Sequence, residues 1–243
     1  MHHALFTRVQ YLLSVGELSQ LPPDRGAEVA FAGRSNAGKS SAINALCGRR
    51  GIAFVSRTPG RTQLINFFQV GAGRYLVDLP GYGYANAPAA QRARWEVLIG
   101  TYLRQRQALR GLILVMDARH PLTPLDRRML DWFAATRRPV HALLSKADKL
   151  SRQAGQRQRM ESQEALSRLY PTVSVQLFSS STSVGLEEAR EAVARMLEMG
   201  KGAEGDAPDA TPEGVESNRE PRSGPRKRNP RLKGIKPGVK PQL

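Results

Sequence analysis

The stretch "EVAFAGRSNAGKSSAINALCG", residues 28–48, contains an apolar run, a glycine-rich segment and a second apolar segment of helical period. Its centre, Gly33 to Ser40, has the pattern G-x-x-x-x-G-K-[ST], which binds phosphates where it joins a strand to a helix. The glycines let backbone N–H groups turn toward the phosphates, Lys39 reaches the β- and γ-phosphates, and Ser40 can bind Mg²⁺. A glycine-rich turn without a ligand is the alternative, and the strand-to-helix context favours the phosphate loop.

Apolar runs alternate with helical patterns between about residues 28 and 200, which is typical of an α/β domain with a mostly parallel sheet. The predicted strands are residues 28–32, 64–70, 74–79, 111–117, 140–145 and 173–178. Only Gly71, Ala72 and Gly73 separate the second strand from the third, so these two should form an antiparallel hairpin. We predict an α/β fold with a six-stranded, mostly parallel sheet, one antiparallel edge hairpin and helices on both faces.

Two helices are predicted from apolar residues at helical spacing. One apolar face comprises Trp95, Leu98, Ile99, Tyr102 and Leu103, and the other comprises Leu186, Ala189, Val193, Met196 and Leu197. Residues 28–200 are expected to form the domain. Residues 1–27 are expected to pack on it, either as another strand or against an edge.

The segment "DLPG", Asp78 to Gly81, ends one predicted strand. Asp78 can hold Mg²⁺ through water, and the Gly81 N–H can bond a γ-phosphate, which would make the following residues sensitive to hydrolysis. Thr62, in "TPGRTQ", is the natural second Mg²⁺ ligand. By itself the segment could be an ordinary turn, and the phosphate loop upstream favours a nucleotide-dependent switch.

The segment "SKAD", Ser145 to Asp148, ends another predicted strand, at the edge where open α/β sheets bind ligands. The Asp148 carboxylate can accept hydrogen bonds from N1–H and N2–H₂ of guanine, a donor pair that adenine lacks, and Lys146 can stack its aliphatic stem along the base. In isolation the pattern could be a solvated turn. The small hydroxyl residues of "FSSSTSVG", residues 178–185, could support the guanine O6.

The composition limits the classes of function. The chain has 243 residues and a formal net charge of +16, which favours a polyanionic partner such as nucleic acid or an acidic membrane surface. No apolar run approaches the roughly 20 residues of a membrane span, and no signal peptide is recognised, so we expect a cytoplasmic protein. Cys47 is the single cysteine and the four histidines lack metal-ligand spacing, so neither zinc nor thiol catalysis is expected.

Residues 201–243 differ in composition from the rest of the chain. They carry ten basic and six acidic residues, rich in Pro and Gly, which leaves a charge of +12 on residues 1–200. Such a segment buries too little apolar surface to order itself, so we expect a disordered tail, acidic and then basic. The tail could be merely solvated, or its basic residues could contact RNA phosphates.

The motifs "GRSNAGKSS", "TPGRTQLINFF", "DLPGYGYA", "SKADKL" and "FSS", in this order, closely resemble the EngB (YihA/YsxC) family of bacterial GTP-binding proteins. The resemblance implies a Ras-like P-loop G domain that binds and hydrolyses GTP with Mg²⁺, held by Ser40, Thr62 and Asp78. It also implies a role in assembling the large ribosomal subunit and a requirement in cell division and septation. We expect a monomer. Carried over by motif, the residues that would bind the nucleotide are Gly33, Arg34, Ser35, Asn36, Ala37, Gly38, Lys39, Ser40, Gly60, Arg61, Thr62, Gln63, Leu64, Asp78, Leu79, Pro80, Gly81, Ser145, Lys146, Ala147, Asp148, Phe178, Ser179 and Ser180.

Tyr82, directly after Gly81, bears on hydrolysis. A Ras-type site orients water with a glutamine near this position, and a phenol cannot replace that amide. Related GTPases of this kind use a monovalent cation held by an asparagine of the phosphate loop, so K⁺ bound at Asn36 is expected to stimulate hydrolysis. The expected catalytic residues are Lys39, Thr62, Gly81 and Asn36; Arg57 or Arg61 could contribute positive charge instead.

Two other functions stay open. The first is an RNA-binding assembly factor in which nucleotide is structural and turnover is negligible, which the tyrosine at position 82 motivates. The second, a P-loop kinase for a small molecule, is disfavoured because it gives "SKAD" no role. One residue departs from the family pattern: Ser145 stands where the family usually has Thr, and its hydroxyl should still bond to the phosphate loop.

Overall fold

The computed structural model describes residues 3–53, 64–83, 89–170 and 172–199. The expected ligands Gly60, Arg61, Thr62 and Gln63, the alternative arginine Arg57 and the tail lie outside these ranges. Within them, no helix combines the length and apolar character that a membrane crossing requires.

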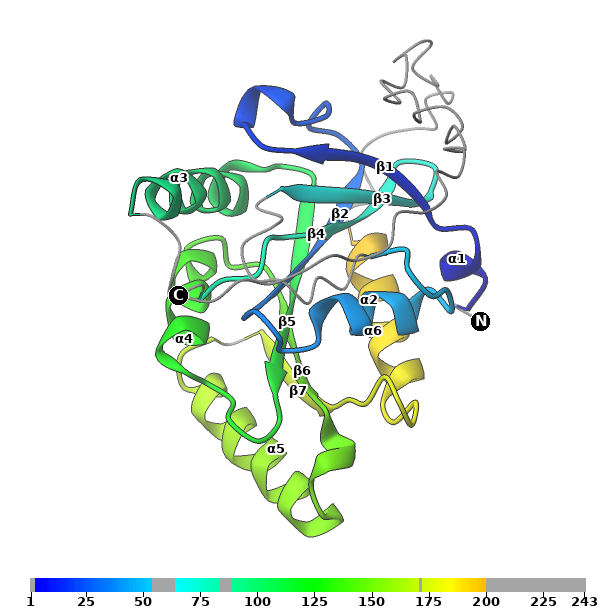
Figure 1. The fold of residues 1–243 in the computed structure, drawn as a ribbon, viewed down its shortest axis with the longest axis vertical. Coiled ribbons are helices and arrows are strands. Elements are labelled where there is room, and N and C mark those ends of the chain that lie inside the picture. The colour runs from blue at the N-terminus through cyan, green and yellow to red at the C-terminus, as the bar shows by residue number, and fades with distance from the viewer. Residues whose placement is uncertain (1–2, 54–63, 84–88, 171, 200–243) are drawn as a thin grey trace, which may run out of the picture. The chain divides into compact units, whose positions relative to one another are not determined.

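The described residues form a seven-stranded sheet with the order β1-β3-β4-β2-β5-β6-β7 (Figure 1). All pairings from β4 to β7 are parallel, and β3 is antiparallel to both of its neighbours. Each predicted strand is present with its ends shifted by at most two residues, and the predicted hairpin is β3–β4. The strands are β1 (Gln10–Val15), β2 (Ala27–Gly33), β3 (Ile65–Gly71), β4 (Arg74–Asp78), β5 (Leu109–Asp117), β6 (Val140–Ser145) and β7 (Val173–Leu177).

The seventh strand corrects the predicted number of six. β1 comes from the N-terminal extension and pairs antiparallel with β3 at the edge of the sheet. Its register shifts between Tyr11 and Leu13, which interrupts the alternation of buried and exposed side chains that marks a half-buried strand. The strand therefore depends on its pairing with β3, which local sequence does not reveal.

The described part of the chain has six helices beside the sheet, α1 (His3–Thr7), α2 (Lys39–Leu46), α3 (Ala89–Gln105), α4 (Pro124–Ala134), α5 (Arg152–Ser167) and α6 (Leu186–Glu198), with 3₁₀ turns η1 (Leu18–Gln20) and η2 (Ala147–Lys149). Their starts follow local chemistry. The Thr123 side chain accepts a bond from the Asp126 N–H, and Pro124 supplies the first helical residue of α4. Ser151 caps α5 in the same way. Such a cap stabilises a helix by about 1 kcal/mol.

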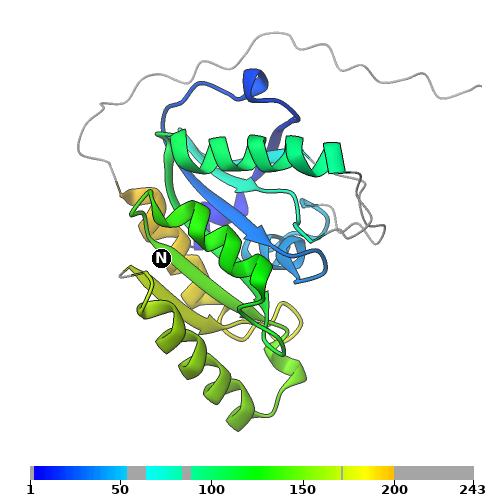
Figure 2. The same ribbon diagram turned by 90° about the vertical axis from the view of Figure 1, so that its left-hand side faces the viewer.

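The helices cover both faces of the sheet, as predicted, and enclose two apolar clusters. The helices α3, α4 and α5 lie over one face, which is turned toward the viewer in Figure 2, whereas α1, α2 and α6 contribute to the cluster on the other face. The predicted faces of α3 and α6 are buried, except that Trp95 and Leu186 are only partly so. Cys47 is buried in the second cluster, and burial raises the pKa of its thiol to about 12, so the sulfur stays protonated at neutral pH.

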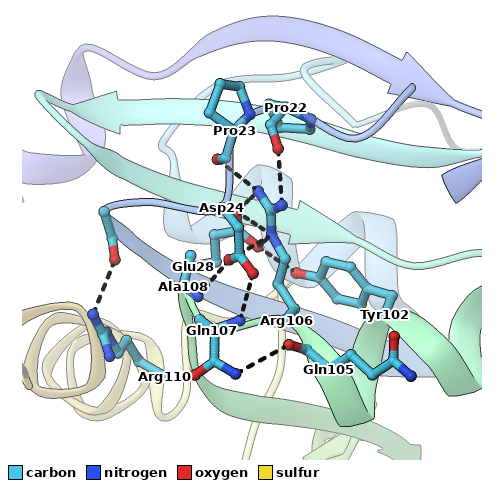
Figure 3. A network of polar contacts seen from close by, with 11 residues as sticks. Pro22, Pro23, Asp24, Glu28, Tyr102, Gln105, Arg106, Gln107, Ala108 and Arg110 are labelled. Atoms are coloured by element: carbon cyan, nitrogen blue, oxygen red, sulfur yellow. Dashed lines mark hydrogen bonds and ion pairs between the residues drawn. The ribbon is translucent and has the colours of Figure 1, made fainter. Parts of the chain in front are cut away.

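The N-terminal extension is joined to the sheet through a buried ion pair (Figure 3). Glu28, on β2, is fully buried, and it accepts hydrogen bonds from the Arg106 guanidinium and from the Tyr102 hydroxyl at 2.8 Å. The same guanidinium donates to the carbonyls of Pro22 and Pro23. The Arg106 guanidinium thus links the two prolines of the extension to Glu28 on β2, and this network fixes the path of the extension into β2. Removing either partner of the buried ion pair would leave an uncompensated charge.

The edge strand β7 is covered by a side chain of α5. Oε1 of Gln163 accepts a hydrogen bond from the Val175 N–H at 2.9 Å, and its Nε2 donates to the Val173 carbonyl at 3.3 Å. The amide group therefore satisfies a backbone donor and a backbone acceptor of this strand.

Candidate functional site

The glycine-rich loop connects the end of β2 to the start of α2. Gly33 approaches the neighbouring strand β5 so closely that a Cβ at position 33 would lie 2.6 Å from the Val115 carbonyl oxygen. Gly38 has φ 96° and precedes the first residue of α2, a conformation that side chains rarely adopt. Both glycines are therefore required by geometry, and the loop has the strand-to-helix placement predicted for it.

Lys39 and Asp78 meet at the base of this loop. The Lys39 ammonium forms an ion pair with Oδ1 of Asp78, and the two residues are only 9% and 5% exposed. Ser40 follows Lys39 at the start of α2 and lines the same cavity as the ion pair. A hydroxyl and a carboxylate here are the hard oxygen donors that Mg²⁺ prefers, so the described residues fit the ion. Thr62, the other predicted ligand, lies outside the described residues.

A cavity of about 1140 Å³ opens beside the loop. Its charged lining is mostly basic, with Asp78 as the single carboxylate among the described residues. Such a lining favours an anionic ligand, as does the start of α2. The basic residues are Arg34, Lys39, Arg49, Arg50 and Lys146, and further predicted ligands in the lining are Ser35, Asn36, Gly38, Ser40, Leu64, Leu79, Pro80 and Gly81.

The "SKAD" segment is fastened to the phosphate loop. The Ser145 hydroxyl is a hydrogen-bond donor to the Ala37 carbonyl and lies 3.0 Å from the Met116 carbonyl. Lys146, which has φ 57°, donates to the Asn36 carbonyl at 2.7 Å. Serine at position 145 thus makes the bond to the phosphate loop that was expected of it.

Asp148 is joined to the segment after β7. Its Oδ1 accepts a hydrogen bond of 2.6 Å from the Ser179 hydroxyl, and this bond lowers the pKa of the Asp148 carboxyl. The Ala147 N–H donates to the Phe178 carbonyl at 3.1 Å, which holds the two segments together. The bond therefore favours the ionised form of the carboxylate, which is the acceptor for donors such as those of guanine. Asp148, Phe178 and Ser179 are not part of the cavity lining, and Ser180 is exposed.

Asp117 was missed by the sequence analysis. It ends β5 and accepts bonds from the Arg119 guanidinium at 2.9 and 2.7 Å and from the Lys146 ammonium at 2.9 Å. These bonds hold the pKa of the Asp117 carboxyl well below its usual range. Asp117 therefore holds Lys146 against the phosphate loop, and the available signal was an acidic residue at the end of a buried strand.

Tyr82 points away from the cavity. It is 5% exposed, it packs in the cluster beneath α3 and α4, and its hydroxyl donates to Oδ1 of Asp126 at 2.8 Å. Burial, followed by the neighbouring Asp126 carboxylate, raises the pKa of Tyr82 well above its usual value. Its backbone contributes to the site, because the Tyr82 carbonyl accepts a bond of 2.9 Å from the Ser35 N–H. The phenol is thus a core group, consistent with the expectation that it does not orient water.

The sheet order, the phosphate loop and the fastened "SKAD" segment define a P-loop GTPase with an α/β fold of the Ras-like class. Residues 28–146 match the family described as 50S ribosome-binding GTPase. The chain belongs to the EngB family of GTP-binding proteins, since it is 53% identical over 206 residues to "Probable GTP-binding protein EngB" of Methylobacillus flagellatus, covering 85% of this chain and 98% of the relative.

Two further comparisons agree with this membership. The protein of the same name in Thiobacillus denitrificans is 60% identical over 186 residues, covering 76% of this chain and 89% of the relative. The crystal structure of "a probable GTP-binding protein engB" matches with a TM-score of 0.54 and 20% identity, covering 70% of this chain and 98% of that one. At that identity the structural likeness supports the fold alone.

Proposed function

We propose that this GTPase is a slow switch that assists assembly of the large ribosomal subunit. The observation that carries the guanine-dependent part is the Asp148 carboxylate, which is hydrogen-bonded to Ser179 beside a segment fastened to the phosphate loop. The ribosomal part is supported by the family description, 50S ribosome-binding GTPase, and by the charge of +12 on residues 1–200.

The proposed nucleotide site comprises the loop Gly33 to Ser40, the segment Gly60 to Leu64, Asp78 to Gly81, Ser145 to Asp148, and Phe178 to Ser180. Mg²⁺ would be held by Ser40, Thr62 and Asp78, and it supplies charge neutralisation at the phosphates when bound. In the described structure the Lys39 ammonium is paired with Asp78. If Asp78 held the cation through water, the Lys39 ammonium would be free to bind a phosphate.

The proposal includes the chain's division and setting. Residues 1–27 are the extension, residues 28–200 the GTP-binding domain and residues 201–243 a tail that is acidic and then basic. The protein acts as a cytoplasmic monomer, K⁺ at Asn36 accelerates its hydrolysis, and its loss impairs septation and cell division through ribosome supply.

Sedimentation with ribosomal particles tests the ribosomal part. The full chain is mixed with large-subunit precursors in the presence of GTP, a non-hydrolysable GTP analogue, GDP or ATP. Co-sedimentation with the first two nucleotides and release with GDP are expected. Equal binding in all four conditions would contradict a GTP-dependent switch.

A second function is favoured by one specific observation, the burial of Tyr82 against Asp126. Its side chain cannot orient water from this position, so an RNA-binding assembly factor with structural nucleotide is the alternative. GTP hydrolysis measured with and without large-subunit particles separates the two functions, because only the switch is accelerated by the particle. Product analysis also excludes a kinase if labelled phosphate appears only as inorganic phosphate.

A further inference from the structure

The amino ends of the parallel strands carry a row of arginines, at the end of the sheet opposite the phosphate loop. β4 begins with Arg74, which is paired with Ala27 at the start of β2, and Arg25 lies two residues before that start. Leu112 of β5 pairs with Val140 of β6, so the same register extended by two residues places Arg110 beside Arg138. We call the set Arg25, Arg74, Arg110, Arg137 and Arg138 the arginine edge.

Two of these side chains contain buried donors without an acceptor. Arg110 donates through Nη2 to the Gly26 carbonyl at 3.1 Å (Figure 3), but its Nε has no hydrogen-bond partner within the described ranges. The same holds for Nη1 of Arg138. Buried donors are nearly always paired, so each of these atoms indicates an acceptor that the described chain does not provide.

The charge balance also indicates a missing anion. Burial lowers the pKa of Arg138, and the neighbouring Arg110 charge lowers it further, in spite of the opposing carboxylates of Asp24 and Glu28. Glu28 is already bonded to Arg106 and Tyr102, as Figure 3 shows for the surrounding network. Asp24 accepts the N–H groups of Gln107 and Ala108 at 2.9 and 2.8 Å. These carboxylates are bonded to other groups, and they offset the charge of the arginine pair only in part.

We propose that the arginine edge binds the phosphates of an RNA strand. The guanidinium fork suits phosphate oxygens, and an RNA phosphate would supply both the missing acceptor and the missing charge. Neighbouring strands lie about 4.8 Å apart, so the row from β4 to β6 extends over roughly 14 Å, longer than a single phosphate group. This inference rests on the proposed function in one respect only: that function identifies the RNA as ribosomal RNA.

This placement separates RNA from nucleotide. Arg110 and Asp117 lie near opposite ends of β5, about 23 Å apart at roughly 3.3 Å per residue. Contacts at the arginine edge therefore leave the cavity beside Lys39 open, and the protein binds RNA and GTP at the same time.

The test uses the full chain, a labelled 20-nucleotide oligouridine and anisotropy over a range of KCl concentrations. One variant, Arg74→Gln with Arg137→Gln, removes two charges without removing any side-chain hydrogen bond seen among the described residues. A second variant, Arg110→Gln with Arg138→Gln, removes the two arginines whose buried donors have no acceptor among the described residues. The matched control, Arg152→Gln with Arg157→Gln, removes the same charge from α5.

We expect each edge variant to lower the slope of log affinity against log salt by up to about 1.4, at roughly 0.7 per phosphate contact, while the control keeps the parent slope. An unchanged slope in the Arg74 and Arg137 variant, or an equal loss in the control, overturns the proposal. So does loss of binding to acidic phospholipid vesicles with an unchanged RNA slope, because it assigns the edge to a membrane.

Two measurements separate this proposal from folding and from the proposed function. The melting temperature of the Arg110 and Arg138 variant should equal or exceed that of the parent, because the variant removes a buried repulsion; a structural role would lower it. GTP affinity should be unchanged in both edge variants. If the parent chain binds no GTP, the proposed function fails, whereas the RNA slopes still decide the role of the arginine edge.

Discussion

The Tyr82 hydroxyl and the Asp126 carboxylate lie 2.8 Å apart, joining the segment after Gly81 to the first turn of α4. The same carboxylate accepts the N–H and hydroxyl of Thr123, at 2.9 and 2.7 Å, so one buried side chain caps the helix and holds the phenol. Gly83 also contacts α4, since a Cβ there would lie 2.9 Å from Cδ1 of Leu125. The end of the "DLPG" segment is therefore seated on this helix.

Tyr82→Phe should lower the free energy of unfolding by about 1.5–3 kcal/mol, the range for a hydrogen bond to a charged group. The rate of GTP hydrolysis should not change, because the hydroxyl faces the core. Denaturant unfolding and single-turnover hydrolysis measure the two effects. Tyr170→Phe is the matched control, since its hydroxyl bonds at 3.1 Å to Asp131, which is exposed. A tenfold or greater fall in hydrolysis would show that the phenol does reach the reacting phosphate.

Ser145→Ala should weaken GDP binding and lower the unfolding free energy by about 1–2 kcal/mol, because it removes the hydroxyl donor to the buried Ala37 carbonyl. Ser145→Thr retains the hydroxyl and serves as the control, with an affinity close to that of the parent. Calorimetric titration with GDP measures both variants. If the alanine variant binds GDP as tightly as the threonine variant, the link between the two loops has no part in affinity.

Asp148→Asn should reduce GTP affinity by roughly 100-fold or more, because two charge-assisted hydrogen bonds are lost. Xanthosine triphosphate has an oxygen in place of the guanine amino group, so the variant should bind it better than GTP. Competition with a fluorescent nucleotide measures both. Asp131→Asn, on the exposed side of α4, should leave GTP affinity unchanged. Retention of GTP preference in the Asp148 variant would remove this residue from base selection.

GTP hydrolysis should be faster in K⁺ than in Na⁺ buffer, and Asn36→Ala should abolish the difference. Asn36 lines the cavity, and it adopts φ 63°, a conformation that asparagine tolerates better than most residues. Phosphate release at equal ionic strength measures the effect, and GDP affinity of the variant in Na⁺ buffer controls for loss of the loop. Equal rates in the two salts would exclude a K⁺ site.

His141 predicts a pH dependence of stability. Its ring nitrogens lie 2.6 Å from Oγ of Ser174 and 2.6 Å from Oε1 of Gln176. The Gln176 amide nitrogen donates to the Gly185 carbonyl, which leaves Oε1 as the acceptor of the imidazole N–H. Burial lowers the pKa of His141 from its usual value.

The unfolded chain therefore binds a proton before the folded one does. Stability contributed by neutral His141 is complete above the unfolded pKa of about 6.5 and decreases as the pH falls below it. Denaturant unfolding between about pH 5.5 and 8 should show this decrease, and His141→Gln should remove that component of it. The exposed His120 provides the control, because His120→Gln should keep the parent's pH profile. An identical profile for the His141 variant would contradict the assignment.

The phosphate loop could be predicted because its signal is local: the glycines, the lysine and the flanking strand and helix are contiguous. Gly33 is required by the nearby Val115 backbone, and Gly38 is required by its own positive φ. The parallel strands could also be predicted, because strands that are buried on both faces, such as β2, have continuous apolar sequences. The bond from Ser145 to the phosphate loop could be predicted because a serine hydroxyl can donate the same hydrogen bond as the threonine hydroxyl that the family usually has there.

The rest depends on contacts between distant segments. β1 exists as a strand through its pairing with β3, and Asp117 matters through Lys146, which is 29 residues away along the chain. The direction of the Tyr82 side chain is set by Asp126 on α4. No local pattern around these residues encodes their partners, so only the three-dimensional arrangement reveals them.

Gln163 has a consequence for how molecules of this protein behave when crowded. A free sheet edge is a template on which a neighbouring chain can add a strand and begin a fibril. The side-chain amide of Gln163 bonds the backbone of Val173 and Val175 as one peptide group of an added strand would. The backbone groups of Val173 and Val175 that an added strand would bond are already hydrogen-bonded to Gln163. At this point of β7 a side chain, rather than charge or proline, therefore blocks the addition of a strand from another molecule.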